Sequence, residues 1–566
     1  MPRAFKPYPF EPRHHPAKLP PLRRGADPRR HPVVIVGAGP VGYCAAIGLA
    51  QHGIRVVLLE ADDSVCVGSR AICISRRSLE IMERLGAIEG FRRTGLPWTG
   101  GRSFYRDAEV LHFQMPQDDD QKHPPMVNLA QYHIEQILLD RCLEMPELID
   151  IRWQARATAL DTRDDGIRLQ VSTPLGDYAI EADWLVAADG GRSFVREALG
   201  LKLEGTSYEG RYVIVDILMK SDRPTERLAY FDPPCNPGST VLVHKQPHDV
   251  WRIDYQLRDG EDSDAAIQPQ NVMPRVESLL QMMGERAEWS PIWTGIYKAN
   301  ALTLPRYREG RALLAGDAAH LLPIFGVRGA NSGIDDADNL AWKLAFVIQG
   351  TAGERLLDTY SHERVAAARE NLSQASKSTE FMAPPSFAFE LMRTAVLGLA
   401  VKHAHVRSLI NPRQTSAISY IDTPLNVADD PDDGFTAGPP PGAVLLECPL
   451  LWVDDGGVRR QGHITDLLHH TGTRPAFTAL HFTRTPDAAG PLQALQARLA
   501  NDRILLNVMP ISGSAQGPNS RAFALYGVEA EALYLVRPDG HVMARWCHAD
   551  AARLVASVER TLRSLA

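Results

Sequence analysis

Cysteine is scarce in this sequence, and long apolar runs are missing from it. Seven cysteines occur in 566 residues, and none of them forms a Cys-x-x-Cys pair. An odd number at irregular spacing argues against a disulfide framework or a zinc site, so we expect no metal and a cytoplasmic location. No run of about eighteen apolar residues could span a membrane, and no apolar core of a secretory signal follows the basic N-terminus.

Positive charge is not in excess either. The formal net charge is −7, whereas nucleic-acid-binding domains are usually strongly basic. The chain is therefore expected to bind neither nucleic acid nor a membrane. Its length of 566 residues is too great for a single core and predicts several domains.

Changes of pattern along the chain suggest where these domains lie. Residues 1–30 carry eight Lys or Arg against two acids and are expected to form a flexible arm. Residues 31–205 and 301–425 combine buried strands with helices, and residues 206–300 between them resemble an inserted antiparallel sheet. Residues 426–442, rich in Asp and Pro, are expected to link this body to a small α/β domain over 443–566.

A Gly-x-Gly-x-x-Gly motif is the first chemical signal. Gly37, Gly39 and Gly42 stand between the buried strand 33–36 and a helix predicted over 41–52. Such glycines allow a tight turn, close approach of a pyrophosphate and close packing of helix on strand. Glu60 ends the next strand, where a carboxylate accepts hydrogen bonds from ribose hydroxyls and repels a 2′-phosphate. The unit therefore predicts FAD or NAD binding in an α/β, Rossmann-type domain.

Two later motifs place an acid at the end of a buried strand. Asp189 and Gly190 open a stretch that continues through Ser193 to Arg196, and Asp317 follows the strand over 312–315. The second motif runs on through a glycine-rich entry to a helix. An acid and a glycine-rich helix entry at a strand end suit a sugar-alcohol chain and a polarised ring.

With these three motifs in this order, the chain resembles the class A flavin monooxygenases of the para-hydroxybenzoate hydroxylase fold group. Within that group it is most similar to phenol hydroxylases and 3-(3-hydroxyphenyl)propionate hydroxylases with a thioredoxin-like C-terminal domain. The resemblance covers residues 32 to 565. It implies FAD as cofactor and NAD(P)H as co-substrate.

The resemblance also assigns cofactor-binding positions. They are Gly37, Gly39, Gly42, Glu60, Arg70, Gln131, Asp189, Asp317, Pro323, Gly329, Ala330 and Asn331. At Ala330 and Asn331 the backbone N–H groups would face the flavin pyrimidine edge. The chain departs from the family at Ala330, where Met or Leu is usual, and at Arg328, where Gln or Lys is commoner. His320 is expected to be a packing residue and not a catalytic base.

The implied reaction is hydroxylation of a phenolic substrate with NAD(P)H and O2 through a flavin C4a-hydroperoxide. A residue on the inserted sheet would help to deprotonate the phenol. The candidates are Tyr230, Asp254 and Asp216, with Tyr255 and Tyr297 beside them. The loop 115–123 and the segment 375–415 are expected to border the substrate pocket. Simple phenols or phenylalkanoates are the first expectation for the substrate, and polycyclic antibiotic precursors the second.

The C-terminal domain resembles thioredoxin but lacks Cys-x-x-Cys, so thioredoxin's redox chemistry is excluded. It is expected to have a structural role or to form the interface of a homodimer. Two other functions stay open: a flavin-binding sensor of redox state or aromatic ligands, and an epoxidase or reductase on the same fold. The Trp-x-Trp-x-Ile-Pro signature of flavin halogenases is absent from the sequence.

Overall fold

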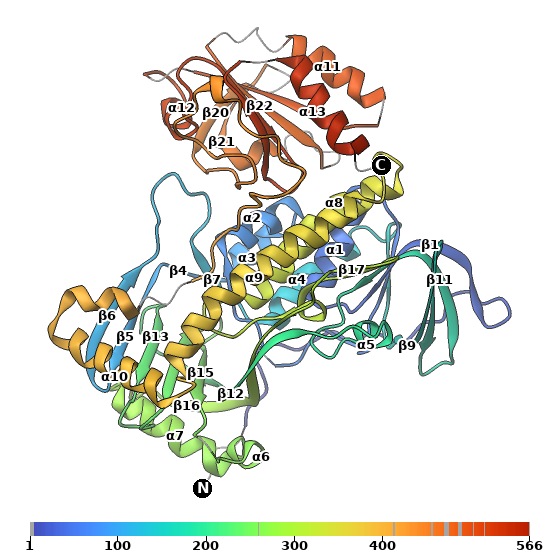
Figure 1. Cartoon of the computed structure of the whole chain (residues 1–566). Coiled ribbons are helices and arrows are strands. Elements are labelled where there is room, and N and C mark those ends of the chain that lie inside the picture. The colour runs from blue at the N-terminus through green and yellow to red at the C-terminus, as the bar shows by residue number, and fades with distance from the viewer. Residues whose placement is uncertain are drawn as a thin grey trace.

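The computed structural model describes residues 5–68, 70–258, 260–410, 414–453, 457–468, 475–484, 490–501, 503–513, 516–548 and 550–564. Figure 1 shows a C-terminal domain, coloured orange to red, stacked on a larger body that is built around two sheets. Within the described residues, no helix combines the length and apolar character needed to cross a membrane. All seven cysteines are free thiols.

The first sheet is the expected Rossmann-type sheet. Its strands are β1 (Ala26–Val36), β2 (Val56–Leu59), β8 (Ile149–Arg152), β11 (Tyr178–Ala187), β17 (Arg308–Glu309) and β18 (Ala312–Leu314). They lie in the order β17-β18-β11-β1-β2-β8, and the pairs from β18 to β8 are parallel. The antiparallel strands β9 (Arg156–Arg163) and β10 (Gly166–Ser172) continue from β11. Because both faces are covered, residues 33–36 are fully or almost fully buried, as a parallel strand requires.

Helices cover this sheet and carry its carboxyl-end loops. Helix α1 (Pro40–Gln51) packs against α4 (Gln131–Leu143) and α8 (Gly329–Ile348). The short helix α5 (Phe194–Ala198) follows β11. Since β1, β11 and β18 run in parallel, their carboxyl ends meet at one edge, and the three sequence motifs come together there.

The second sheet holds the inserted strands. These are β12 (Glu204–Met219), β13 (Arg227–Phe231), β14 (Thr240–Lys245), β15 (Val250–Gln256) and β16 (Trp289–Thr303). The edges are β19 (His320–Leu321) on one side, and β5 (Gly100–Tyr105) and β6 (Ala108–Gln114) on the other, in the order β19-β16-β12-β15-β14-β13-β5-β6. We call this the substrate sheet. The expectation that residues 31–205 belong only to the cofactor domain is therefore wrong for residues 100–114, because β5 pairs with β13 far along the chain.

The two faces of the substrate sheet have different covers. Helices α6 (Ser263–Ala266) and α7 (Pro269–Met282) follow β15, and α7 packs on one face in a core with Val213, Val215 and Ile253. The other face packs against the ends of α9 (Leu356–Met382) and α10 (Phe387–Lys402) in a core that includes Tyr212 and Leu242. The remaining elements of the body are β3 (Cys73–Ser75), α2 (Arg76–Arg84), α3 (Ile88–Thr94), β4 (Leu96–Trp98) and β7 (Met126–Asn128), of which the strands form a small sheet.

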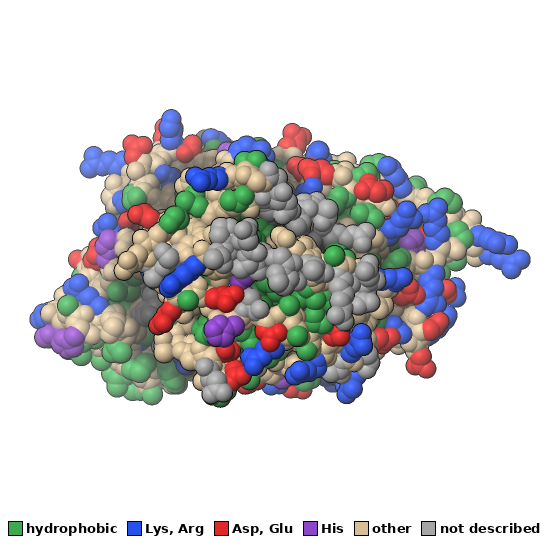
Figure 2. Space-filling model, turned by 90° about the horizontal axis from the view of Figure 1, so that it is seen from above, with side chains coloured by type: hydrophobic (Ala, Val, Ile, Leu, Met, Phe, Trp, Pro, Cys, Tyr) green, Lys and Arg blue, Asp and Glu red, His purple; other side chains and the backbone are tan. Residues whose placement is uncertain are grey.

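Helix α10 presents an apolar outer surface. Phe387, Leu391 and Leu399 are each more than half exposed. Figure 2 shows hydrophobic side chains gathered at the left-hand end of the molecule, the end at which α10 lies in Figure 1. The inner surface of the same helix packs toward the substrate sheet through Leu397 and Ala400, which are buried.

The N-terminal arm was expected to be flexible, but its described residues pack against the body. In residues 5–23 the Tyr8 hydroxyl donates to Asp216, and the ring of Phe10 stacks on Tyr132 at a centroid distance of 4.8 Å. His15 stacks on Trp153 at 4.4 Å. Each aromatic contact contributes on the order of 1 kcal/mol to the binding of the arm. These contacts stabilise a segment whose composition is too polar to fold by itself. Strand β1 also begins at Ala26, within the segment 1–30 that was expected to be flexible.

The C-terminal domain has its own sheet in the order β23-β22-β24-β25. Its elements are β20 (Pro449–Val453), β21 (Arg459–His463), β22 (Phe477–Thr483), α11 (Gly490–Asn501), β23 (Leu506–Ser512), α12 (Ser520–Leu525), β24 (Ala532–Val536), β25 (Val542–Trp546) and α13 (Ala551–Ser564). The expected linker 426–442 is tied to this domain by the ion pair between Asp429 and Arg545. The loop 115–123 was expected to border the substrate pocket, but its Lys122 and Asp120 pair with Asp466 and Arg521 of the C-terminal domain. It contributes no residue to the apolar cavity described below.

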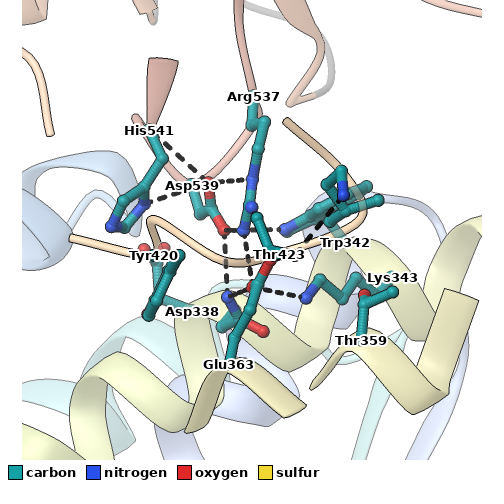
Figure 3. Close-up of polar contacts among 12 residues, drawn as sticks. Asp338, Trp342, Lys343, Thr359, Glu363, Tyr420, Thr423, Arg537, Asp539 and His541 are labelled. Atoms are coloured by element: carbon teal, nitrogen blue, oxygen red, sulfur yellow. Dashed lines mark hydrogen bonds and ion pairs between the residues drawn. The ribbon is translucent and has the colours of Figure 1, made fainter. Parts of the chain in front are cut away.

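A buried polar cluster joins this domain to the helices of the body. Arg537, in the turn between β24 and β25, donates to both carboxylate oxygens of Glu363 in α9, at 2.7 and 3.0 Å. Lys343 in α8 donates to the same carboxylate at 2.7 Å, and Trp342 donates to Asp539 at 3.1 Å. Figure 3 shows these side chains converging from the turn above and the helices below. We call this set the domain lock.

Candidate functional site

The glycine-rich loop after β1 has the close packing that its sequence predicts. Gly37 has φ +99°, and a Cβ there would lie 2.4 Å from the carbonyl oxygen of Ala188. A Cβ on Gly42 would lie 1.9 Å from the carbonyl oxygen of Gly37. A Cβ on Gly39 would meet nothing within 4 Å, so space is open beside the start of α1. Helix N-termini of this kind bind phosphate groups through their free N–H groups.

Glu60 lies beside that loop, at the end of β2. One carboxylate oxygen accepts from the N–H of Ala38 at 2.7 Å, and the other accepts from the N–H of Asp62 at 3.0 Å. Burial raises its pKa, and these backbone hydrogen bonds oppose that rise. Each carboxylate oxygen keeps a second lone pair, so Glu60 can hold the loop and still accept from a ribose hydroxyl.

Asp317 and Arg70 lie within electrostatic range of each other, and both are exposed. Asp317 follows β18, is exposed to solvent and makes no side-chain hydrogen bond to the described residues. The surrounding protein desolvates it and raises its pKa, while the charges of His320 and Arg70 lower it. Arg70 is also exposed, and its carbonyl oxygen accepts from Arg252 at 2.9 Å. A carboxylate and a guanidinium whose hydrogen-bonding atoms are not used within the described protein suit a long polar ligand.

The Asp189 motif is tied to the Asp317 motif. Asp189 accepts from the Ser193 hydroxyl at 2.5 Å and from the N–H of Val195 at 3.0 Å, which fixes the start of α5. Arg196 donates to the carbonyl oxygens of Gly191 at 2.7 Å and Ala318 at 3.1 Å. Asp189 thus orders the backbone at the start of α5, and Arg196 of that helix holds the backbone beside Asp317.

The loop before α8 is strained. Val327 has φ +59°, a left-handed conformation that is unusual for a β-branched side chain and typical of functional sites. It follows the buried Pro323 and precedes Gly329, where α8 begins. The first N–H groups of a helix have no partner within the helix, so those of Gly329, Ala330 and Asn331 are available to a ligand.

The side chain of Asn331 is not available, however. Its amide oxygen accepts from the N–H of Ser75 at 2.9 Å and the hydroxyl of Ser78 at 2.7 Å. Its amide nitrogen donates to the carbonyl oxygens of Cys73 and Val327. Asn331 therefore fixes the start of α8, and only its backbone can serve a ligand. Arg328 points toward α9, where it donates to Asn371 at 2.7 Å.

His320 belongs to a buried supporting network, as expected. Asp336 accepts from His320 at 2.7 Å, from the N–H of Gly316 at 2.9 Å and from Arg364 at 2.6 Å. Burial opposes ionisation, but Arg364 and His320 hold the pKa of Asp336 at about 2. This network anchors the turn that presents Asp317.

Gln131 supports the loop that carries Arg70. Its amide oxygen accepts from the N–H of Ala71 at 3.1 Å, and its amide nitrogen donates to Glu135 at 2.8 Å. Glu135 in turn accepts from the N–H of Cys66 at 2.6 Å. In this arrangement Gln131 orders the loop that carries Arg70.

An apolar cavity of about 300 Å³ lies on the substrate sheet under α9 and α10. Its walls include Phe231 of the sheet, Phe325 of the loop before α8, and Phe381 of α9. Segment 375–415 lines it as expected, through residues from Lys377 to Ile410. Because Phe325 lies two residues before Val327, the cavity borders the loop at the start of α8.

The catalytic candidates are divided between the two faces of the sheet. Tyr230 and Tyr255 pack in the core under α7, whereas their neighbours Ala229 and Phe231 face the cavity side. The predictions for Tyr230 and Tyr255 are therefore wrong, because side chains alternate between faces and these two point away. Tyr297 lies on the cavity side, but its hydroxyl donates to the carbonyl oxygen of Leu322.

Asp216 and Asp254 lie on the cavity side of the substrate sheet, and both are buried. Their strand partners Arg252 and Leu242 share this face. Asp254 accepts from Arg252 at 2.9 Å. Asp216 accepts from Tyr8 at 2.7 Å, and burial raises its pKa to about 6 although Arg252 opposes the rise.

Tyr8 and Arg252 were not predicted from the sequence. Tyr8 lies in an arm with no periodicity, and it reaches Asp216 over 208 residues of chain. Arg252 alternates with apolar residues in β15, a pattern that would normally place a charged side chain in solvent. Asp254, two residues after Arg252, was the sequence signal for a buried arginine, because a buried arginine needs an acid as its partner.

Comparison with known proteins adds to this geometry. The family described as FAD binding domain matches residues 30–375. A 3-(3-hydroxy-phenyl)propionate/3-hydroxycinnamic acid hydroxylase of Shigella sonnei (strain Ss046) is 33% identical over 354 residues. That match spans 62% of this chain and 62% of the relative, so less than two thirds of either length is covered.

Solved structures match over most of the chain. The flavin-dependent monooxygenase PieE, in complex with FAD and substrate, superposes with a TM-score of 0.74 at 23% identity and covers 95% of this chain and 100% of its own. At this identity the likeness shows the fold. Aklavinone-11 hydroxylase, in a ternary complex with FAD and aklavinone, has a TM-score of 0.71 at 25% identity, with 94% and 99% covered.

Proposed function

The chain belongs to the FAD-binding domain family, and from this we propose that it is an FAD-dependent monooxygenase that hydroxylates a phenolic substrate with NAD(P)H and O2. The observation that carries the proposal is the apolar cavity beside the strained loop at the start of α8. The similarity to a hydroxyphenylpropionate hydroxylase and to aklavinone-11 hydroxylase supports it.

The residues at the carboxyl edge of the first sheet fit FAD. Open space at Gly39 suits the pyrophosphate, and Glu60 suits the adenosine ribose. Asp317 and Arg70, without side-chain hydrogen-bond partners in the described structure, would hold the ribityl chain and the ring side. Gln131 and Asp189 would act by shaping the loops around it, and the N–H groups of Gly329, Ala330 and Asn331 would face the pyrimidine edge.

Bound FAD, once reduced by NAD(P)H, supplies the activation of O2. The protein must orient the ring of the substrate and keep water out. Phe231, Phe325 and Phe381 line the cavity with apolar surface, which excludes water from the reacting atoms.

The protein must also move the phenolic proton. We retain Asp254 and Asp216 as candidates, because both lie on the cavity side of the sheet. Asp254 is the first choice, since its neighbour in register, Leu242, belongs to the apolar core that includes Phe231 of the cavity wall. Asp216 is the second, with Tyr8 as its hydrogen-bond donor.

The cellular and assembly assignments belong to this proposal as well. Seven free thiols support a cytoplasmic location. We assign the C-terminal domain to the thioredoxin type on its β-α-β-α-β-β-α element order, with a structural role supported by the domain lock. A homodimer through this domain is the remaining alternative.

The test is to purify the yellow holoprotein and measure NADH and NADPH oxidation and oxygen uptake over a panel of phenols. We expect a phenol to stimulate both, with a product heavier by one oxygen atom. A yellow protein that no aromatic compound stimulates would overturn the proposal in favour of a flavin-binding sensor. Product spectra without ring hydroxylation would favour an epoxidase or a reductase.

A further inference from the structure

The N-terminal arm contacts both halves of the body around Tyr8. This side chain is half-buried, and its hydroxyl donates to Asp216 of β12 at 2.7 Å. Its ring meets Tyr132 of α4 edge-on at a centroid distance of 5.1 Å. Two residues earlier, the N–H of Lys6 donates to the carbonyl oxygen of Pro291 in β16. The arm thus runs from the substrate sheet to the helices of the first sheet, and Tyr8 is the residue that reaches a buried charge on the way.

Asp216 depends on this contact. The residue is completely buried, and its Oδ1 makes no hydrogen bond to any residue that the structure describes. Within the described residues, the Tyr8 hydroxyl is therefore the one hydrogen-bond donor to this carboxylate. Burial raises the pKa of Asp216 to about 6, whereas the charge of Arg252 and the hydrogen bond from Tyr8 lower it. The same burial and the charge of Asp216 raise the pKa of Tyr8, so its hydroxyl keeps the proton that it donates.

Asp216 ends a row of buried polar side chains that crosses the substrate sheet. In register, Arg227 of β13 lies beside His244 of β14, which lies beside Arg252 of β15, which lies beside Asp216. Burial and the charges of the two arginines lower the pKa of His244, so its ring is neutral at neutral pH. Asp254 accepts from Arg252 at 2.9 Å, and its charge also acts on Arg227. Two arginines and two aspartates therefore balance each other in this row.

Arg252 connects the row to the loop that carries Arg70. Its Nη1 donates to the carbonyl oxygen of Arg70 at 2.9 Å, and Arg70 is one of the residues that would hold FAD. Protonation of Asp216 would leave Asp254 as the remaining anion among these four charged groups. A buried positive charge would then lose its compensation, which is strongly unfavourable. The ionised form of Asp216 thus favours the arrangement in which Arg252 supports the Arg70 loop.

We propose that Tyr8 is a positioning residue for the FAD site, because its hydrogen bond to Asp216 holds the Arg70 loop in place. The hydroxyl acts through the carboxylate and through Arg252, and does not itself touch the cofactor. The inference rests on the binding of FAD in the proposed function and is independent of hydroxylation.

This arrangement makes the affinity for FAD depend on pH. The groups that face Asp216 are Tyr8 from the arm, Arg252 and Asp254 from β15, and the uncharged Tyr132 from α4. With a pKa of about 6, Asp216 is ionised above that pH and protonated below it. FAD should therefore bind most tightly above about pH 7 and dissociate as the pH falls through 6.

The experiment measures the release of FAD from the diluted holoprotein by the rise in flavin fluorescence, without substrate or NAD(P)H. For wild type we expect the dissociation constant of FAD to rise by roughly 5- to 100-fold between about pH 8 and pH 5, the usual range for coupled sites. Tyr8→Phe removes one hydrogen bond to a charged group. It should move the midpoint of this rise upward by roughly one to two pH units.

Two further variants separate this effect from a loss of structure. Asp216→Asn cannot ionise, so its FAD release should show no step near pH 6. Tyr132→Phe is the matched control, because the Tyr132 hydroxyl acts on Asp216 through charge alone, and it should keep the wild-type profile. Circular dichroism reports whether each variant is folded. The wild-type profile tests the inference even if no variant folds.

A flat wild-type profile, a midpoint that Tyr8→Phe does not move, or a step that survives in Asp216→Asn would overturn the inference. Weaker binding of FAD by Tyr8→Phe by the same factor at every pH would also overturn it, since a purely structural role of the arm involves no titration. A phenol screen without product would overturn hydroxylation and leave these results standing. A protein that binds no FAD at any pH would overturn both.

Discussion

Replacing Glu363 by Gln tests the domain lock most directly. The Glu363 carboxylate accepts from Arg537, Lys343, Asn339 and Thr423, all within 3.0 Å. With Asp539, the two acids of the lock balance the two cations. Burial opposes ionisation of Glu363, but the charges of Arg537 and Lys343 keep its pKa well below the ordinary value. The Gln variant would leave one positive charge unbalanced in a buried place.

Breaking a buried ion pair by removing one partner costs about 3–5 kcal/mol. Lys343 limits this cost. Burial already lowers the pKa of Lys343 to about 8 although Glu363 opposes the shift, so loss of Glu363 lets the lysine release its proton near neutral pH. We therefore expect the Gln variant to lose about 3 kcal/mol of unfolding free energy, the lower end of that range.

The assay is urea unfolding of the FAD-loaded protein, followed by tryptophan fluorescence because Trp342 donates to Asp539 at the lock. The free energy of the first transition is the quantity compared, since several domains need not unfold together. Glu370→Gln is the matched control, an exposed acid two turns further along α9 that should change stability by less than about 0.5 kcal/mol. If the two variants unfold alike, the lock does not stabilise the docked domain.

Three further predictions concern the body of the protein. Gly37→Ala should abolish FAD binding, measured as flavin content after dialysis, because the Cβ would lie 2.4 Å from a backbone oxygen; retained flavin would contradict the tight turn. The folded-state pKa of Asp336 is lowered to about 2 from 3.8, so its stabilisation is complete above about pH 4 and is lost as the pH falls toward 2. The difference in unfolding free energy between wild type and Asp336→Asn should shrink by about 2 kcal/mol over that window; a constant difference would refute the ion-pair assignment. Asp254→Asn should lower the fraction of NADH oxidation coupled to product, whereas Tyr230→Phe should keep it at the wild-type value, because Tyr230 faces α7; the reverse result would contradict the assignment of faces.

The cofactor half of the site could be predicted because its signals are local. Gly37, Glu60 and Asp317 each follow a buried parallel strand, and parallel strands bring their carboxyl ends to one edge. The sequence could not show that Asn331 uses its side chain to hold α8, since its partners Ser75 and Ser78 are more than 250 residues away.

The substrate half was harder to predict. Every residue of β13 is buried, so the alternation that normally separates two faces carries no information, and Tyr230 was placed on the wrong one. The pairing of β5 with β13 joins segments more than 120 residues apart and has no signature in either strand. Arg227 stands in the same uniformly buried strand, and only the structure shows that its Nη1 makes no hydrogen bond to a described residue.

The N-terminal arm has a practical consequence for work on this protein. Its residues contact the substrate sheet at Asp216, helix α4 at Tyr132 and the first sheet's edge at Trp153, so the arm fastens parts of the chain that are distant in sequence. Trypsin can cut the arm after several basic residues, among them Arg13 and Lys18. The rate of cutting there would report how firmly the arm is seated, and an affinity tag is better fused at the other end of the polypeptide.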